Sequence, residues 1–97
     1  MTLSDEDRAE ALKALPDWRY DESERAIRRD FRFADFGAAF AFMTRVALAA
    51  EKSDHHPDWS NSWNRVAVAL STHSAAGVTG KDVELAKAMD GFAAGLP

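Results

Sequence analysis

The spacing of hydrophobic and polar residues changes several times along the chain, and each change predicts a new element. Near the start, Ser4 can cap a helix, and Asp7 can close the capping box three residues later. Leu12 and Leu15 continue this helix on one side at helical spacing, and Pro16 is expected to end it. The first element is therefore a helix that ends before Pro16.

Two strand-like segments follow the first helix. Residues 17–20 form a short strand candidate, and residues 26–33 form a longer one beyond a polar turn. In the longer segment, Ile27 and Phe31 point to one face of the predicted sheet, while the alternate positions are charged. Arg29 interrupts the apolar face, which places it near a sheet edge where its head can reach water.

The longest predicted helix covers about residues 36–52, with Asp35 as its cap. It carries two apolar stripes, although a surface helix needs only one. The first stripe contains Phe36, Phe40, Met43, Ala47 and Ala50, and the second contains Phe42, Val46 and Ala49. We interpret the second stripe either as an extra core contact under a loop or as a subunit interface.

Strand-like alternation returns after a loop at residues 54–58, where Pro57 excludes helical geometry at the residue before it. Residues 59–63 and 66–71 alternate in hydrophobicity, with Asn64–Arg65 as a tight turn between them. This pattern predicts a second hairpin.

A second capping box opens the last helix, with Thr79 as the cap and Asp82 three residues later. The predicted order is α-β-β-α-β-β-α. Hairpins imply antiparallel pairing, and amphipathic helices must cover one face of the sheet. We therefore expect a single two-layer α+β domain over residues 1–97, with a four-stranded antiparallel sheet and three helices on one face.

Composition and charge narrow the function classes. The chain has 97 residues, of which 46% are hydrophobic, and this suits one folded domain better than a disordered chain. The formal net charge of −4 disfavours nucleic-acid binding by phosphate neutralisation. The basic run from Arg25 to Arg32 is interpreted as a solvated sheet face or, alternatively, as a contact for an acidic partner.

The sequence contains no cysteine, which excludes disulfides and thiolate-rich metal sites. The first residues do not follow the pattern of a signal peptide. The apolar-rich stretch at 36–50 is interrupted by Gly37 and Arg45 and is too short to span a bilayer. We expect a soluble cytoplasmic protein that does not insert into membranes.

The candidate chemistry lies in three histidines. His55 and His56 sit in the loop before the second hairpin, and His73 follows its last strand. Because antiparallel pairing returns the chain, both segments are expected at the same end of the sheet. Asp54, Asp58 and Asp82 are possible partners that could orient the imidazoles, although capping is the more ordinary role for Asp82.

Three explanations of the histidines stay open at this point. They could be a coincidence of surface residues, a metal site or a centre of general acid–base catalysis. Adjacent side chains on an extended segment point apart, which makes it awkward for His55 and His56 to bind one ion, and the chain has no HExxH-type spacing.

The segment Glu51–Trp59 is similar to one found in the pterin-4a-carbinolamine dehydratase family, whose members are also known as dimerisation cofactors of a homeodomain transcription factor. The resemblance extends over roughly Ser4 to Ala93. The other matching positions are Asn61, Asn64, Val66, Leu70–His73, Gly77–Thr79 and Lys81–Asp82, with Phe31–Phe33, Asp35–Phe36 and Phe42–Ala47 upstream. The departures are mild: Trp63 replaces a common Tyr, residues 74–76 lack the cysteine of animal relatives, and Lys81 replaces a frequent Arg.

The resemblance implies the same order of elements and names the site residues. It implies a catalytic group of His55, His56, His73 and Asp82, in which Asp82 is the acidic residue associated with the third histidine. It also implies substrate contacts from Trp18, Asp54, Pro57, Ser71 and Thr72, with Trp18 bordering the active site.

The implied reaction is loss of water from C4a of a 4a-hydroxytetrahydropterin, which gives the quinonoid dihydropterin. A general acid protonates the departing hydroxyl, and a base removes the N5 proton. We expect His55 and His73 to exchange these protons and His56 chiefly to hold the pterin. No metal and no cofactor is expected.

The resemblance also implies a homodimer or homotetramer and a functional link to an aromatic amino-acid hydroxylase. Two alternatives remain for the function. The chain could be an oligomerisation or coactivator module with little dehydratase activity, or a mononuclear metal hydrolase that uses the three histidines.

Overall fold

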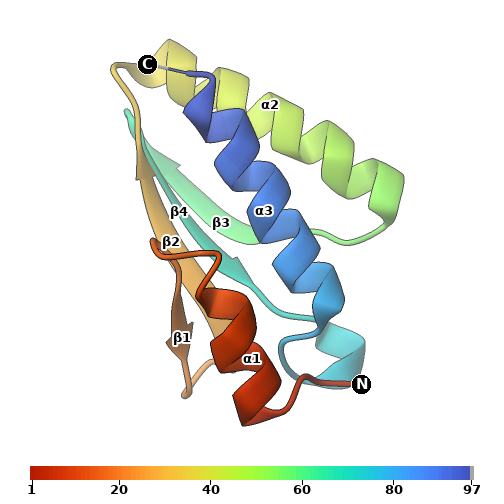
Figure 1. The fold of residues 1–97 in the computed structure, drawn as a ribbon. Coiled ribbons are helices and arrows are strands. Elements are labelled where there is room, and N and C mark those ends of the chain that lie inside the picture. The colour runs from red at the N-terminus through yellow and green to blue at the C-terminus, as the bar shows by residue number, and fades with distance from the viewer. Residues whose placement is uncertain (97) are drawn as a thin grey trace.

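The computed structural model describes residues 1–96 and contains the predicted elements in the predicted order (Figure 1). They are α1 (Asp5–Leu12), β1 (Arg19–Asp21), β2 (Ala26–Arg32), α2 (Phe36–Ser53), β3 (Asp58–Ser62), β4 (Arg65–Leu70), the short 3-10 helix η1 (His73–Ala75) and α3 (Gly80–Ala94). The α-β-β-α-β-β-α prediction is confirmed.

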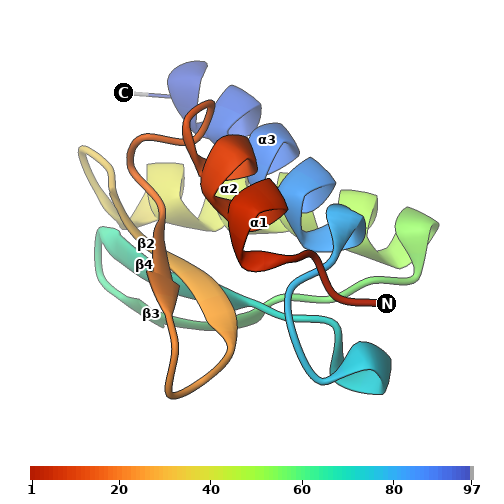
Figure 2. The same cartoon turned by 60° about the horizontal axis from the view of Figure 1, so that its bottom comes forward.

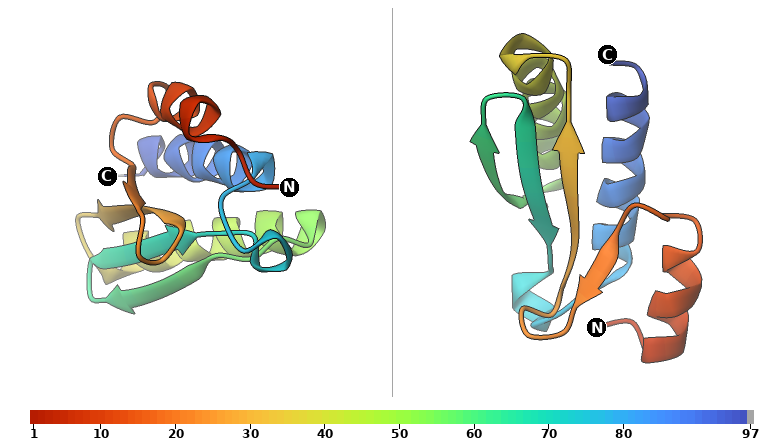
Figure 3. Two further views of the ribbon diagram at one scale, coloured as in Figure 1. Left: turned by 90° about the horizontal axis from the view of Figure 1, so that it is seen from below. Right: turned by 90° about the vertical axis from the view of Figure 1, so that its left-hand side faces the viewer.

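The four strands form one antiparallel sheet in the order β1-β2-β4-β3. All three helices cover the same face of this sheet, and the opposite face is turned toward the viewer in the right panel of Figure 3. Figure 2 shows the three helices above the sheet, with α1 nearest the viewer. The predicted two-layer architecture is therefore correct.

Alternation along β2 and β4 builds the inner face of the sheet. Ile27 pairs with Leu70 and Phe31 pairs with Val66, and all four side chains are buried. The ring of Phe42 on α2 lies 4.6 Å from the ring of Phe31, which joins the helix layer to the sheet at its centre.

The second apolar stripe of α2 supplies the largest core contacts of this helix, which agrees with its interpretation as core and not as a subunit interface. The buried residues of this helix are Ala39, Phe42, Val46 and Ala50. Phe36 is half-exposed, and Phe40 is 57% exposed. The helix is thus rotated so that the second stripe meets the sheet, and two phenylalanines from the first stripe face outward.

Smaller shifts concern the ends of elements. α1 ends at Leu12, and the buried Leu15 lies in the turn beyond it. The β3–β4 turn consists of Trp63 and Asn64, with Trp63 at a φ of 49°, because Ser62 and Arg65 already pair across the hairpin. Among residues 1–96, no helix has both the length and the apolar character needed to cross a bilayer.

Phe42→Ala should destabilise the protein by about 3–5 kcal/mol, because it leaves a cavity between the helix layer and the sheet. Trp63→Ala is the matched control, since the Trp63 ring is 65% exposed, and it should change stability by less than about 0.5 kcal/mol. Urea unfolding followed by circular dichroism measures both. Equal losses in the two variants would contradict this placement of the core.

Candidate active site

The end of α2 sets the direction of the first two histidines. Asp54 caps the helix in the left-handed conformation with a φ of 53°, and its N–H donates back to the last turn. The next N–H, that of His55, donates to the carbonyl of Ala50 at 3.1 Å. This turn sends the His55 side chain inward, while His56 stays exposed before Pro57.

His55 forms a short hydrogen bond with a buried carboxylate. Its Nε2 lies 2.6 Å from Oδ1 of Asp82, which is fully buried. The other carboxylate oxygen, Oδ2, accepts hydrogen bonds at 2.9 Å from the Thr72 hydroxyl and from the backbone N–H of Thr79. Asp82 thus closes the capping box of α3 and binds a histidine with the same carboxylate.

The other two histidines also face carboxylates, but at the surface. Nε2 of His56 lies 3.1 Å from Glu51, and Nε2 of His73 lies 3.3 Å from Asp58. The side chain of His73 is 77% exposed. The expectation that Asp82 accompanies the third histidine is therefore wrong: Asp82 binds His55, and Asp58 is the carboxylate beside His73.

All three histidines line one hollow of about 360 Å³ between the α2–β3 loop and the end of β4. The other lining residues are Asp54, Pro57, Asp58, Ser71, Thr72, Ser74 and Lys81. Asp82 lies behind His55 and does not line the hollow. The hydrophobicity pattern alone did not single out Lys81, whose position one residue before Asp82 on the first turn of α3 places it at the rim.

Trp18 does not border this hollow, so the expected aromatic wall is absent from its lining. Its indole N–H donates to Asp90 on α3 at 2.8 Å, and its ring packs edge-on against Phe31. Asp90 also accepts from Arg29 at 2.6 Å. Arg29 therefore does not lie near a sheet edge as expected, because β2 is flanked by β1 and β4, and its head pairs with the carboxylates of Asp90 and Asp17.

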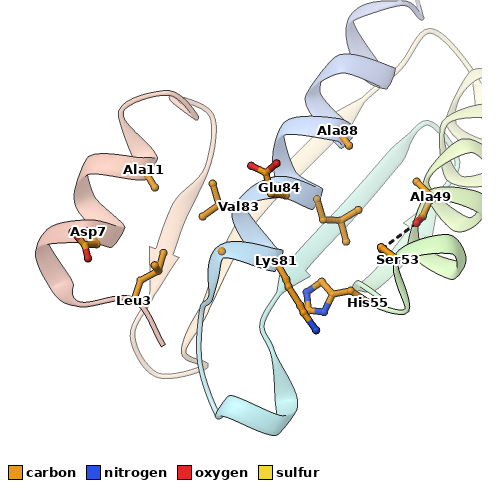
Figure 4. Close-up of a pocket in the computed structure, with 12 residues that line it drawn as sticks. Leu3, Asp7, Ala11, Ala49, Ser53, His55, Lys81, Val83, Glu84 and Ala88 are labelled. Atoms are coloured by element: carbon orange, nitrogen blue, oxygen red, sulfur yellow. Dashed lines mark hydrogen bonds between the residues drawn. The ribbon is translucent and has the colours of Figure 1, made fainter. Parts of the chain in front are cut away.

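A larger groove of about 780 Å³ lies on the other side of His55, between α1, α3 and the end of α2 (Figure 4). Its walls are mainly apolar and include Leu3, Ala11, Ala49, Val83, Leu85 and Ala88. His55 and Lys81 line both the groove and the polar hollow, so these two side chains separate the two spaces. Only the polar hollow contains all three histidines.

The part of the chain that the structure describes holds no group of three or more His, Asp or Glu side chains arranged to bind a metal ion. His55 is directed into the protein and His56 away from it. The hollow instead presents imidazoles, carboxylates, hydroxyls and an ammonium group, which are groups that bind polar molecules and move protons.

A family model described as pterin 4 alpha carbinolamine dehydratase matches residues 1–92. The chain belongs to the pterin-4-alpha-carbinolamine dehydratase family. The family description indicates a hydro-lyase, an enzyme that removes water, and the chain is assigned to that enzyme class.

Curated relatives and a crystal structure agree with this membership. A protein of Rhizorhabdus wittichii is 62% identical over 94% of each chain, and one of Rhodopseudomonas palustris is 55% identical over 97% of this chain and 93% of its own. Both carry the pterin-4-alpha-carbinolamine dehydratase name as a provisional designation. A crystal structure of a transcriptional coactivator/pterin dehydratase from Brucella melitensis is 47% identical and superposes with a TM-score of 0.93 over 96% of this chain and 99% of that one.

The unequal exposure of the histidines gives a chemical prediction. Diethyl pyrocarbonate should modify His56 and His73 readily and His55 much more slowly, because His55 is 9% exposed and its Nε2 faces Asp82. Peptide mass spectrometry during a time course measures the three rates. If His55 reacts as fast as the other two, the buried pair does not persist in solution.

Proposed function

We propose that this protein dehydrates a 4a-hydroxytetrahydropterin to the quinonoid dihydropterin, by general acid–base catalysis from histidines in the polar hollow. The observation that supports this most directly is that one hollow is lined by three imidazoles, each within 3.3 Å of a carboxylate. Family membership supports the class of substrate.

The reaction requires one proton to be delivered and one to be removed. The acid protonates the C4a hydroxyl, the C4a–O bond breaks and water leaves. The base takes the proton from N5, and the N5–C4a double bond forms. Oxidation states and total protons balance, and imidazoles can perform both transfers near neutral pH.

We assign the proton removal to His55 and the proton delivery to His73. Nε2 of His55 donates to Asp82, so Nδ1 is the nitrogen that carries a free lone pair in the neutral ring. A carboxylate behind an imidazole also stabilises the imidazolium that forms when the base accepts a proton. His73 lies beside Asp58 at the open side of the hollow, where solvent can return a proton to its ring after each turnover. His56 and Lys81 are left to hold the polar heterocycle.

His55→Ala and His73→Ala should each lower kcat about 10²–10⁴-fold, whereas His56→Ala should mainly raise KM. The assay uses freshly generated 4a-hydroxytetrahydropterin and follows the appearance of the quinonoid product by absorbance. Lys13→Ala, at the C-cap of α1 and outside the lining of the hollow, is a control for activity lost during purification. Wild-type rates in both His55→Ala and His73→Ala would reject the acid–base assignment.

Recycling of tetrahydropterin is the setting we propose for this activity. The substrate would be supplied by an enzyme that cleaves molecular oxygen and leaves a hydroxyl on C4a of the tetrahydropterin, such as an aromatic amino-acid hydroxylase. The matching substrate class of the family supports this placement.

A second candidate function, a coactivator or oligomerisation module, is favoured by the similar Brucella protein, which is described as a transcriptional coactivator, and by one surface of this chain. Phe36, Phe40, Ala47 and Leu48 form an exposed apolar face along α2, with the two phenylalanine rings 5.9 Å apart. We propose that this face, which we call the outer face of α2, mediates self-association into a dimer or tetramer.

Phe40→Asp combined with Leu48→Asp should lower the mass measured by light scattering, because charges on the outer face of α2 oppose burial of an apolar contact. The helix should remain folded, since both side chains are exposed in the single chain. Val46→Asp is the contrasting variant: it places a charge in the core and should unfold the protein. An unchanged mass in the folded double variant would exclude this face as the contact.

A further inference from the structure

We propose that Thr79, the N-cap of α3, is a positioning residue that fixes the protonation pattern of His55 through Thr72 and Asp82. The catalytic part of this proposal rests on the proposed function, whereas the part that concerns the ring of His55 does not. Thr72, Thr79 and Asp82 are all buried, and their side chains form a continuous hydrogen-bonded chain.

The direction of each hydrogen bond follows from the number of protons available. A carboxylate only accepts, so the single hydroxyl proton of Thr72 goes to Oδ2 of Asp82 at 2.9 Å. The Thr72 oxygen is then the acceptor in its 2.7 Å contact with Thr79, and Thr79 must donate. The Thr79 oxygen in turn accepts from the backbone N–H of Lys81 at 3.2 Å. The chain therefore runs one way, from Thr79 to Thr72 to Asp82.

This chain leaves one carboxylate oxygen for the histidine. Oδ2 of Asp82 is occupied by the Thr72 hydroxyl and the Thr79 N–H, which leaves Oδ1 to accept from Nε2 of His55 at 2.6 Å. Because two donors hold Oδ2 of Asp82 and Oδ1 accepts from His55, the imidazole keeps its proton on Nε2 and leaves Nδ1 unprotonated. That is the state in which a base can take a proton.

Loss of the Thr79 hydroxyl would leave the Thr72 oxygen without a donor in a buried place, and the first turn of α3 would lose its cap. The Thr79 N–H would still bind Oδ2 of Asp82, but the Thr72 hydroxyl, no longer held by a donor of its own, could turn away from Oδ2. The carboxylate would then be held less firmly, and His55 could exchange between its two neutral tautomers. The N-cap of α3 therefore also determines which ring nitrogen of His55 can accept a proton.

The test compares Thr79→Val, which removes the hydroxyl, with Thr79→Ser, which keeps it. We expect Thr79→Val to lower kcat about tenfold with little change in KM, as misplacement of a reacting group does, and Thr79→Ser to retain most of the wild-type rate. The ring nitrogens of His55, observed by long-range ¹H–¹⁵N NMR, should report one tautomer in the wild type and Thr79→Ser and a mixture in Thr79→Val.

Asp35→Ala is the matched control, because it removes the N-cap of α2 far from the polar hollow and should leave the His55 tautomer unchanged. Thr79→Gly is used if Thr79→Val does not fold, since glycine is tolerated at an N-cap while also lacking the hydroxyl. A single unchanged tautomer and an unchanged kcat in a folded variant without the hydroxyl would overturn the proposal. If the wild type shows no turnover, the proposed function fails, and the tautomer measurement alone decides this inference.

Discussion

The buried carboxylate of Asp82 is the group on which the arrangement of the site depends. An ionised side chain with no exposure to solvent is stable only when donors surround it, and here the donors come from three separate segments. His55 belongs to the loop after α2, Thr72 follows β4, and Thr79 starts α3. The hydrogen bonds that the Asp82 carboxylate requires therefore connect the start of α3, the end of β4 and the loop that carries His55 and His56.

This arrangement gives the hollow a fixed side and an adaptable side. His55 is held by a short hydrogen bond inside the protein, whereas His56 and His73 meet their carboxylates at the surface, where ion pairs contribute little and salt screens them. An acid–base reaction benefits from this difference. In the reaction that we propose, the group that would remove a proton from a defined atom is kept in place, and the groups that would exchange protons with solvent or hold the substrate can adjust to it.

The sequence predicts the order of elements well, because alternation in β2, β3 and β4 and the capping residues Ser4, Asp35 and Thr79 are local signals. It also predicts that both histidine segments reach one end of the sheet, since hairpin geometry determines where a chain returns. The partner of Asp82 was not predictable in this way. Thr72 and His73 are adjacent in sequence, and the turn into η1 directs Thr72 inward and His73 outward. The position of Trp18 is not predictable for a similar reason, because its hydrogen-bond partner, Asp90, lies 72 residues away in the sequence.

The rotation of α2 shows why a helix with two apolar stripes cannot be oriented from its own pattern. Either stripe satisfies the periodicity of an amphipathic helix. The choice comes from restraints elsewhere: Phe42 fits against Phe31 on the sheet, and the turn at Asp54 has to deliver His55 to Asp82. Turning the helix to bury Phe36 and Phe40 would carry the histidine away from the buried carboxylate. The same constraint that assembles the site thus leaves two phenylalanines at the surface, where a second chain can cover them.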